Sequence, residues 1–295
     1  MRWNDLVIQA TGWLAAKGLD SPGADASEIA EVVAGRPLHA VGDPTPEQEE
    51  RFRHMVGQRG QRIPLQHVTG QMYFRYLELA SHPGCFIVRP ETELVAGEAI
   101  DAAAKMVAQC GPQHTVKVAD LCTGSANIAL AVATEFPQSY VIGVELSDEA
   151  LATARENNAR YGNPVALVQG DARDALVGLE GEFSVVVSNP PYVPPTVELS
   201  PEVEADPPMA LWGGGPEGTA LPIAIIERSA ALLRPGGILV MEHAEGQAEA
   251  LVDHAREAGF EEAHTGCDYT GRPRWLWARK AAGPQQATAS SKQVT

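Results

Sequence analysis

Short apolar runs alternate with amphipathic segments along the second part of the chain. The runs predict strands at Val116–Leu121, Tyr140–Leu146, Val165–Val168, Phe183–Ser188 and Gly237–Glu242. The segments between them predict helices at Ile128–Glu135, Asp148–Tyr161, Thr219–Leu233 and Gln247–Ala258. Continuous apolar strands between helices are typical of a parallel sheet covered on both faces. With an antiparallel pair at Glu261–Thr265 and Trp275–Arg279, the pattern predicts a doubly wound α/β fold with a mostly parallel, seven-stranded sheet.

The first part of the chain has helical spacing instead. Apolar residues recur at Leu6, Val7, Ala10, Trp13 and Leu14. Gly18 and Pro22 separate this helix from a second one, and Thr45 predicts the N-cap of a charged helix over 47–59. Residues 1–80 therefore predict a small helical domain that serves packing or partner recognition.

A short segment connects the two parts. Tyr73–Leu77 and Cys85–Val88 predict two strands around His82-Pro83-Gly84, a hairpin linker that ends near residue 90. The sheet domain then covers residues 91–280. Residues 281–295 are small and polar without periodicity, which predicts a disordered tail.

Composition narrows the function. The 295 residues carry a net charge of −16, which disfavours a non-specific grip on a nucleic-acid backbone. No signal peptide or membrane-length apolar run is visible, so we expect a cytoplasmic protein. We also expect a monomer. The chain has four cysteines, Cys85, Cys110, Cys122 and Cys267, and none of them form a C-x-x-C pair. This spacing argues against a zinc site and against a disulfide framework.

Polar residues follow four predicted strands: Asp120, Glu145, Asp171 and Asn189. In a doubly wound sheet these ends lie at the edge where ligands bind, and a carboxylate such as Glu145 can accept the hydroxyls of a ribose. The turn Cys122–Ala126 is built of small residues but lacks both the G-x-G-x-x-G pattern and a P-loop lysine. A nucleoside-like ligand without phosphates, such as S-adenosylmethionine, fits this pattern better than NAD or ATP.

The loop Asn189-Pro190-Pro191-Tyr192 can hold a planar nitrogen. The Asn189 oxygen and the Pro190 carbonyl are acceptors, and neither proline has an N–H. Tyr192 offers an aromatic face. Two acceptors and a ring can grip an amide or an exocyclic NH₂ group with its lone pair aimed at an electrophile.

Over roughly residues 5–280 the chain resembles the HemK family of N5-glutamine methyltransferases, which modify peptide chain release factors. Five segments carry the resemblance: Pro64–Gly70, Ile87–Glu93, Asp120–Ser125, Asn189–Tyr192 and Met241–Gln247. The resemblance implies a Rossmann-like class I methyltransferase domain with S-adenosylmethionine as cofactor, and a helical domain that helps to dock the release factor.

The resemblance also implies site residues. The donor site would include Cys122, Thr123, Gly124, Ser125, Ala126, Glu145, Ala172 and Asn189, together with the strand-end residues Asp120 and Asp171. The glutamine would be held by Asn189, Pro190, Pro191 and Tyr192, with Arg89, Glu91 and Thr92 also binding substrate. Cys122 and Ala126 replace glycines of the family's usual turn, and a positive φ at Ala126 would strain the backbone.

Other readings stay open. The acceptor could be a different amide or amine, on a small molecule or another protein. Adenine N6-methyltransferases share the Asn-Pro-Pro-Tyr loop, although the −16 charge counts against them. A binding protein that has lost catalysis is a further alternative. We expect a structural role for His243, and core positions for Trp275 and Trp277.

Overall fold

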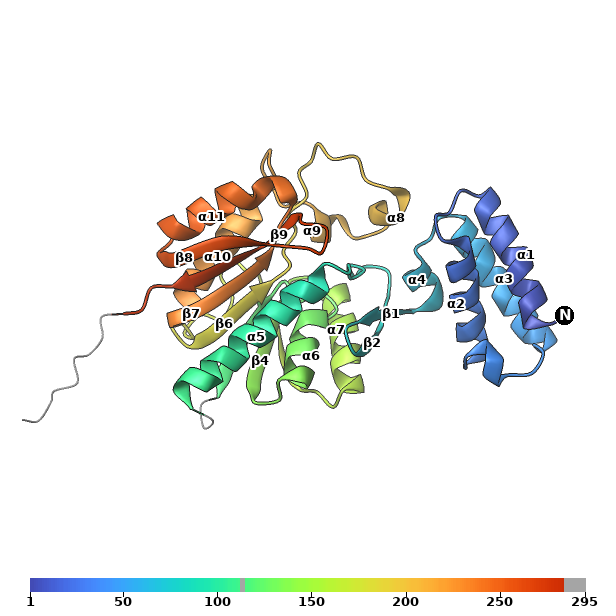
Figure 1. Ribbon diagram of the computed structural model, residues 1–295, viewed down its shortest axis with the longest axis horizontal. Coiled ribbons are helices and arrows are strands. Elements are labelled where there is room, and N and C mark those ends of the chain that lie inside the picture. The colour runs from blue at the N-terminus through green and yellow to red at the C-terminus, as the bar shows by residue number, and fades with distance from the viewer. Residues whose placement is uncertain (112–114, 284–295) are drawn as a thin grey trace, which may run out of the picture.

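The computed structural model describes residues 1–111 and 115–283 (Figure 1). Its N-terminal part is a helical domain, as predicted. The elements are α1 (Trp3–Ala16), α2 (Pro22–Ala34), a 3₁₀ turn (Leu38–Ala40), α3 (Pro46–Gly60) and α4 (Leu65–Thr69). Their apolar faces meet in a separate core that includes Leu14, Ile29 and Phe52. Thr45 caps α3 as predicted, since its hydroxyl accepts the Gln48 N–H at 3.2 Å.

The predicted linker hairpin is placed differently in the structure. Its strands are β1 (Gln71–Phe74) and β2 (Leu77–Ala80), so the prediction of a strand at Cys85–Val88 is wrong. The chain turns at Arg75, whose backbone is left-handed with φ 51°, and both strands fit within ten residues of chain. Residues 85–88 run instead as an irregular segment towards the cavity described below.

The sheet domain has the predicted architecture. Its seven strands lie in the order β5-β4-β3-β6-β7-β9-β8, parallel except for β9, which is antiparallel to both neighbours. The bounds are β3 (Val116–Leu121), β4 (Ser139–Glu145), β5 (Val165–Gln169), β6 (Phe183–Ser188), β7 (Leu233–Glu242), β8 (Phe260–Cys267) and β9 (Pro273–Lys280). Since β3 and β6 are neighbours, the strand order reverses between them, and this reversal is where doubly wound sheets bind ligands.

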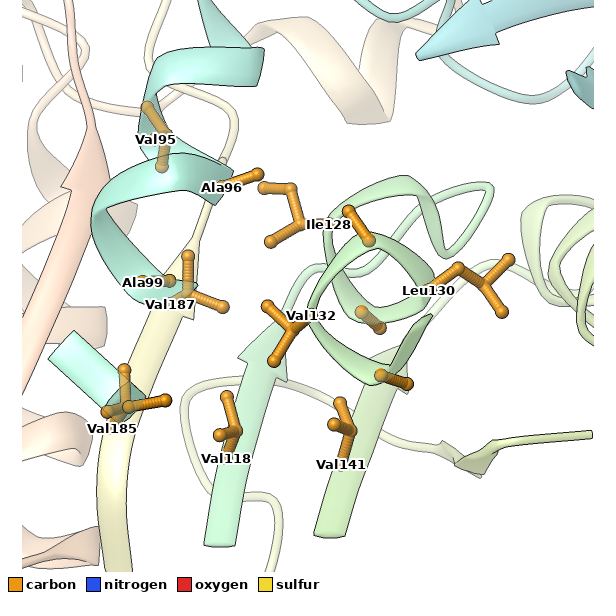
Figure 2. Packing of buried hydrophobic residues seen from close by; sticks show 14 of the residues in the cluster. Val95, Ala96, Ala99, Val118, Ile128, Leu130, Val132, Val141, Val185 and Val187 are labelled. Carbon is orange, nitrogen blue, oxygen red and sulfur yellow. The ribbon is translucent and has the colours of Figure 1, made fainter. Parts of the chain in front are cut away.

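Helices cover both faces of this sheet, because alternate residues of each buried strand point to opposite sides. The helices are α5 (Thr92–Cys110), α6 (Asn127–Glu135), α7 (Asp148–Arg160), α10 (Ala220–Leu232) and α11 (Ala248–Glu257). Figure 2 shows Ala99 of α5 beside Val187 of β6, and Val132 of α6 beside Val118 of β3. On the opposite face, α10 and α11 cover a second apolar cluster.

A segment between β6 and α10 joins the helical domain to the sheet domain. It carries two short helices, α8 (Pro201–Glu204) and α9 (Pro208–Leu211). Glu202 of α8 forms ion pairs with Arg62 at 2.9 Å and Arg59 at 3.4 Å. Arg59 also pairs with the buried Asp25 at 2.7 Å inside the helical domain. These ion pairs connect the segment between β6 and α10, part of which lines the cavity described below, to the helical domain.

Candidate active site

A deep cavity opens at the carboxyl edge of the parallel strands. Its volume of about 770 Å³ suits a cofactor-sized ligand. The loops after β3, β4, β5 and β6 line the cavity, and residues 207–214 line it as well. Predicted site residues that the structure brings together here are Cys122, Thr123, Gly124, Ser125, Glu145, Asp171, Ala172, Asn189, Pro190, Pro191 and Tyr192.

The loop from β3 to α6 turns sharply because it contains left-handed residues. Cys122 has φ 64°, Gly124 has φ 56°, and Ala126, the N-cap of α6, has φ 65°. A left-handed backbone costs a residue with a Cβ about 1–2 kcal/mol. The condition for strain at Ala126, a positive φ, is therefore met, and Cys122 shares it.

Asp120 lies behind this loop. Its fully buried Oδ2 accepts the Thr123 hydroxyl at 2.6 Å and the Ala129 N–H at 3.1 Å. Burial raises the pKa of Asp120 to about 7, although these two donors act in the opposite direction. Asp120 thus tethers the turn to the first residues of α6. Neither Asp120 nor Ala126 lines the cavity, and a contact of either with the donor stays a prediction.

Two further carboxylates border the cavity. Glu145 accepts the N–H of Gly124 on Oε2 and the N–H of Ser147 on Oε1, both at 2.8 Å. Each oxygen keeps a lone pair for a ligand hydroxyl. Asp171 is held by Arg173, and hydrogen bonds from that guanidinium lower the pKa of Asp171. The hydrogen bonds to Glu145 and the contact of Asp171 with Arg173 fix the positions of both side chains.

The loop after β6 presents acceptors to the cavity. Asn189 Nδ2 donates to Thr92 Oγ1 at 3.2 Å, and Thr92 Oγ1 donates to Glu242 Oε2 at 2.7 Å. Within residues 1–111 and 115–283, no donor reaches Asn189 Oδ1 or the Pro190 carbonyl. Both residues line the cavity, so two acceptor oxygens remain for a ligand that carries two N–H bonds.

Glu242 anchors this loop from behind. The Tyr192 hydroxyl donates to its Oε1 at 2.9 Å. Burial raises the pKa of Glu242 to about 7, while the hydroxyls of Thr92 and Tyr192 act against this rise. Among nearby charges, Glu91 adds to the rise and Arg274 opposes it. Burial also raises the pKa of Tyr192, and the adjacent Glu242 adds to that effect.

The backbone beyond Tyr192 is held equally closely. Gln247 donates to the carbonyls of Tyr192 at 2.8 Å and Glu217 at 2.7 Å. At Gly213 and Gly218, a Cβ would lie 2.7 Å from Tyr192 Cα and 2.4 Å from the Tyr192 carbonyl oxygen, respectively. Glycine is therefore required at both positions for the loop to pack as it does.

The part of the cavity wall formed by residues 207–214 is fixed at its start by Asp206, which is 1% exposed. Asp206 accepts the Ile87 N–H at 3.0 Å and forms an ion pair with Arg89. The Arg89 guanidinium lies 5.0 Å from the centre of the Phe86 ring, and Phe86 lines the cavity. The irregular segment around Phe86 and the wall after Asp206 thus support each other.

The three residues expected beside the substrate do not reach the cavity wall. Arg89 pairs with Asp206, and Glu91 pairs with Arg274 at 3.5 Å. Thr92 is buried between Asn189 and Glu242. Their part in substrate binding stays a prediction.

The remaining aromatic and histidine predictions are confirmed. His243 is buried, with Nδ1 at 2.9 Å from the Ala244 carbonyl and Nε2 at 3.1 Å from Thr265 Oγ1. Trp275 belongs to the core, and Trp277 packs against it.

Sequence reasoning gave no role to three residues that hold the site together. Glu242 and Gln247 lay within the matched C-terminal segment, which was the available signal. Asn157 carried no signal. Its Oδ1 accepts the Ala80 N–H at 2.7 Å, and its Nδ2 donates to the Ser125 carbonyl at 3.1 Å. Asn157 thus joins α7 to the linker hairpin and to the turn at the cavity.

The fold and the cavity together define a class of protein. The turn after β3 is made of small residues, the strand beside it ends in Glu145, and no P-loop lysine is present in the turn. Carboxylate acceptors beside a largely apolar cavity fit a nucleoside that carries free ribose hydroxyls and no phosphate. The sheet domain is a Rossmann-like class I methyltransferase domain, and its cofactor is S-adenosylmethionine.

Comparison with known proteins identifies the family. A family model described as methyltransferase small domain matches residues 86–201, and one described as PrmC N-terminal domain matches residues 5–70. The release factor glutamine methyltransferase of Streptomyces coelicolor is 45% identical over 285 residues, which cover 93% of this chain and 97% of that protein. The chain belongs to the family of release factor glutamine methyltransferases.

Two further comparisons extend this result. A 4-amino-L-phenylalanine/4-methylamino-L-phenylalanine methyltransferase of Streptomyces pristinaespiralis is 39% identical over 85% of this chain and 86% of that protein. The solved structure of the hMettl16 catalytic domain, in complex with the MAT2A 3′UTR hairpin 6, aligns with a TM-score of 0.51 at 12% identity. The alignment covers 80% of this chain and 82% of that one, and it supports the fold alone.

The part of the chain that the structure describes contains neither a cluster of metal ligands nor a membrane-spanning helix. No cluster of three or more His, Cys, Asp or Glu side chains could hold a metal ion there. Within the same residues, no helix is long and apolar enough to cross a membrane.

Proposed function

We propose that this protein transfers the methyl group of S-adenosylmethionine to N5 of the glutamine in the Gly-Gly-Gln motif of peptide chain release factors. The family membership supports the acceptor, and the geometry around Asn189 supports the chemistry. We also propose that the residues lining the cavity after β3, β4 and β5 bind the donor, and that residues 189–192 bind the glutamine.

One observation carries the proposal. Asn189 Nδ2 is committed to Thr92, which leaves Asn189 Oδ1 and the Pro190 carbonyl as two free acceptors on the cavity wall. A primary amide carries two N–H donors on a planar nitrogen, so both acceptors can be used at once. A side chain that offers only acceptors would meet unpaired oxygens instead.

The residues of this loop compensate for a weak nucleophile. An amide nitrogen reacts poorly because its lone pair is delocalised into the carbonyl. Holding both N–H bonds at Asn189 and Pro190 would aim that lone pair along the line of attack, and positioning of this kind supplies a large part of many rate accelerations. S-adenosylmethionine, when bound, supplies an electrophilic methyl carbon. The same two acceptors stabilise positive charge that develops on the nitrogen, until one proton leaves to water.

Mass spectrometry tests the proposal. The protein is incubated with S-adenosylmethionine and an unmodified release factor, and the Gly-Gly-Gln peptide is then analysed. One added methyl group on the glutamine is expected. The same release factor with that glutamine changed to asparagine is the control and should remain unmodified. Methylation of 4-amino-L-phenylalanine but not of the release factor would replace the proposal with an amine acceptor.

We further propose that the protein acts in the cytoplasm as a monomer, on a protein rather than directly on nucleic acid. The net charge of −16 supports the last point, because a phosphate backbone attracts clustered Lys and Arg. Light scattering after size exclusion should give a mass close to the 31.4 kDa of one chain. A mass of twice that value would overturn the monomer.

A further inference from the structure

Three residues from separate segments form a chain of hydrogen bonds behind the cavity. Thr92 begins α5, Glu242 ends β7, and Asn189 follows β6. Thr92 is 1% exposed and Glu242 is 2% exposed, and neither lines the cavity. Thr92 contacts Asn189, and Glu242 contacts Tyr192, at the two ends of the loop that would hold the acceptor.

The directions of these hydrogen bonds follow from the chemistry of the groups. When Glu242 is ionised it has no proton to donate, so the Thr92 hydroxyl donates its single proton to Glu242, at 2.7 Å. Thr92 Oγ1 then has only lone pairs left. Its other partner, 3.2 Å away, must therefore be a donor, and Asn189 can meet this demand only with Nδ2.

We propose that Thr92 and Glu242 are positioning residues that determine which way the Asn189 amide faces. The inference rests on the proposed methyl transfer, in which Asn189 Oδ1 accepts from the substrate nitrogen. In the opposite orientation Asn189 would present N–H bonds to the N–H bonds of the substrate, and Oδ1 would meet the lone pairs of Thr92 Oγ1. Both contacts would be repulsive.

Glu242 contacts both ends of the loop from Asn189 to Tyr192, because it also accepts a hydrogen bond from Tyr192. Its hydroxyl donates to Glu242 Oε1 at 2.9 Å, while Thr92 uses Oε2. Glu242 therefore holds Asn189 through Thr92 and holds the Tyr192 ring directly. The buried Glu242 side chain thus anchors both ends of the segment from Asn189 to Tyr192.

Thr92→Val tests the inference, because valine keeps the side-chain shape and removes the hydroxyl. At pH 8 we expect kcat for the release factor to fall roughly 10–100-fold, with the Kd for S-adenosylmethionine within about twofold of the wild type. Thr92→Ser restores the hydroxyl and should recover most of kcat. Thr153→Val is the matched control, since the buried Thr153 hydroxyl donates within its own helix to the Glu149 carbonyl.

Glu242→Gln provides a second variant. A glutamine amide can donate to Thr92, which frees the Thr92 hydroxyl to donate to Asn189 and permits the opposite orientation. A fall in kcat like that of Thr92→Val is expected. A wild-type kcat in Glu242→Gln would overturn the inference, as would a Thr92→Ser variant as slow as Thr92→Val.

A spectroscopic measurement tests the positioning without any acceptor. The side-chain NH₂ signal of Asn189 in a ¹⁵N spectrum is assigned by its loss in Asn189→Asp. Its protons should exchange with water roughly tenfold faster in Thr92→Val than in the wild type, and Thr92→Ser should exchange like the wild type. Equal exchange in all three would refute the contact. If the wild type leaves release factors unmodified, the proposed function fails, and this readout still decides the hydrogen bond.

Discussion

Replacing Asn157 by alanine should weaken both the fold and the donor site. Asn157 is fully buried in α7 and contacts two distant segments. Its Oδ1 accepts the Ala80 N–H at 2.7 Å, and its Nδ2 donates to the carbonyls of Ser125 at 3.1 Å and Ala80 at 3.4 Å. Alanine removes these hydrogen bonds and leaves the backbone groups of both segments without that partner.

The size of the effect follows from what is lost. Removing one partner of a buried hydrogen bond costs about 1–3 kcal/mol, because the group left behind is unpaired. The Ala80 N–H and the Ser125 carbonyl are two such groups, so the free energy of unfolding should fall by about 2–6 kcal/mol. For a domain of this size about 2–4 °C of Tm corresponds to 1 kcal/mol. We therefore expect Tm to fall by about 10 °C.

The donor site should respond as well, because Ser125 lines the cavity and its carbonyl is one of the two anchoring points. Freeing one backbone residue costs about 1–2 kcal/mol when a ligand must order it again. The Kd for S-adenosylmethionine, measured by calorimetry, should thus rise roughly tenfold. Measurements are made well below the lowered Tm so that the protein remains folded.

Asn158→Ala is the matched control. Asn158 neighbours Asn157 and is buried, but it bonds the backbone of Val165 on β5, at 2.8 and 3.1 Å, and neither the hairpin nor the turn. Its loss should lower Tm substantially and leave donor Kd unchanged. The reasoning is refuted if both variants weaken donor binding equally, or if Asn157→Ala leaves donor Kd unchanged.

Three further changes have defined outcomes. In Ala126→Gly, relief of about 1 kcal/mol of left-handed strain is offset by the loss of about 0.8 kcal/mol from a buried methyl group. Tm should therefore stay within about 3 °C, and a donor Kd that tightens tenfold would show that strain limits binding. The rate should rise with pH through a midpoint near 7, because ionised Glu242 accepts from Thr92, and Glu242→Gln should abolish that rise. Stability changes in the opposite sense: the folded-state pKa of Glu242 lies above its ordinary 4.5, so the folded protein keeps a proton that the unfolded chain has lost, and stability falls from pH 4.5 to about 7 and then levels off. Thermal unfolding of the wild type against Glu242→Gln measures this contribution. Asp206→Ala leaves the Arg89 charge without its buried partner, so unfolding free energy should fall by about 3 kcal/mol, and an unchanged chemical denaturation midpoint would contradict the ion pair.

The apolar strands were predictable because burial on both faces leaves a continuous hydrophobic signal. Phe183–Ser188 and Val116–Leu121 have the predicted bounds, and the antiparallel final pair was also found. The hairpin was misplaced for a physical reason. Cys85, Ile87 and Val88 look like a strand, yet Cys85 and Ile87 are buried in an irregular segment that Asp206 holds by the Ile87 N–H. Local pattern does not reveal a backbone partner so far along the chain.

The strand-end residues of the cavity were predictable from position alone, since parallel strands end at one edge. The supporting contacts were not. Thr92 and Glu242 meet across 150 positions of sequence, and Asn157 meets Ala80 across 77. Such pairs depend on how elements pack, which periodicity and spacing do not encode. Asp120 illustrates the same limit, because its place on a strand end was foreseen and its position behind the turn was not.

The place of β9 has a consequence for synthesis of the protein on the ribosome. β9 lies between β7 and β8, and its Trp275 is paired with Glu242 at the end of β7. Until residues 273–280 have emerged, β7 remains an open edge with unpaired backbone groups. A nascent chain that stalls before Pro273 would therefore lack the strand that pairs with Glu242, the residue that contacts Thr92 and Tyr192, and would expose a template for aggregation. The sheet beside Glu242 is therefore complete only when the final strand is in place.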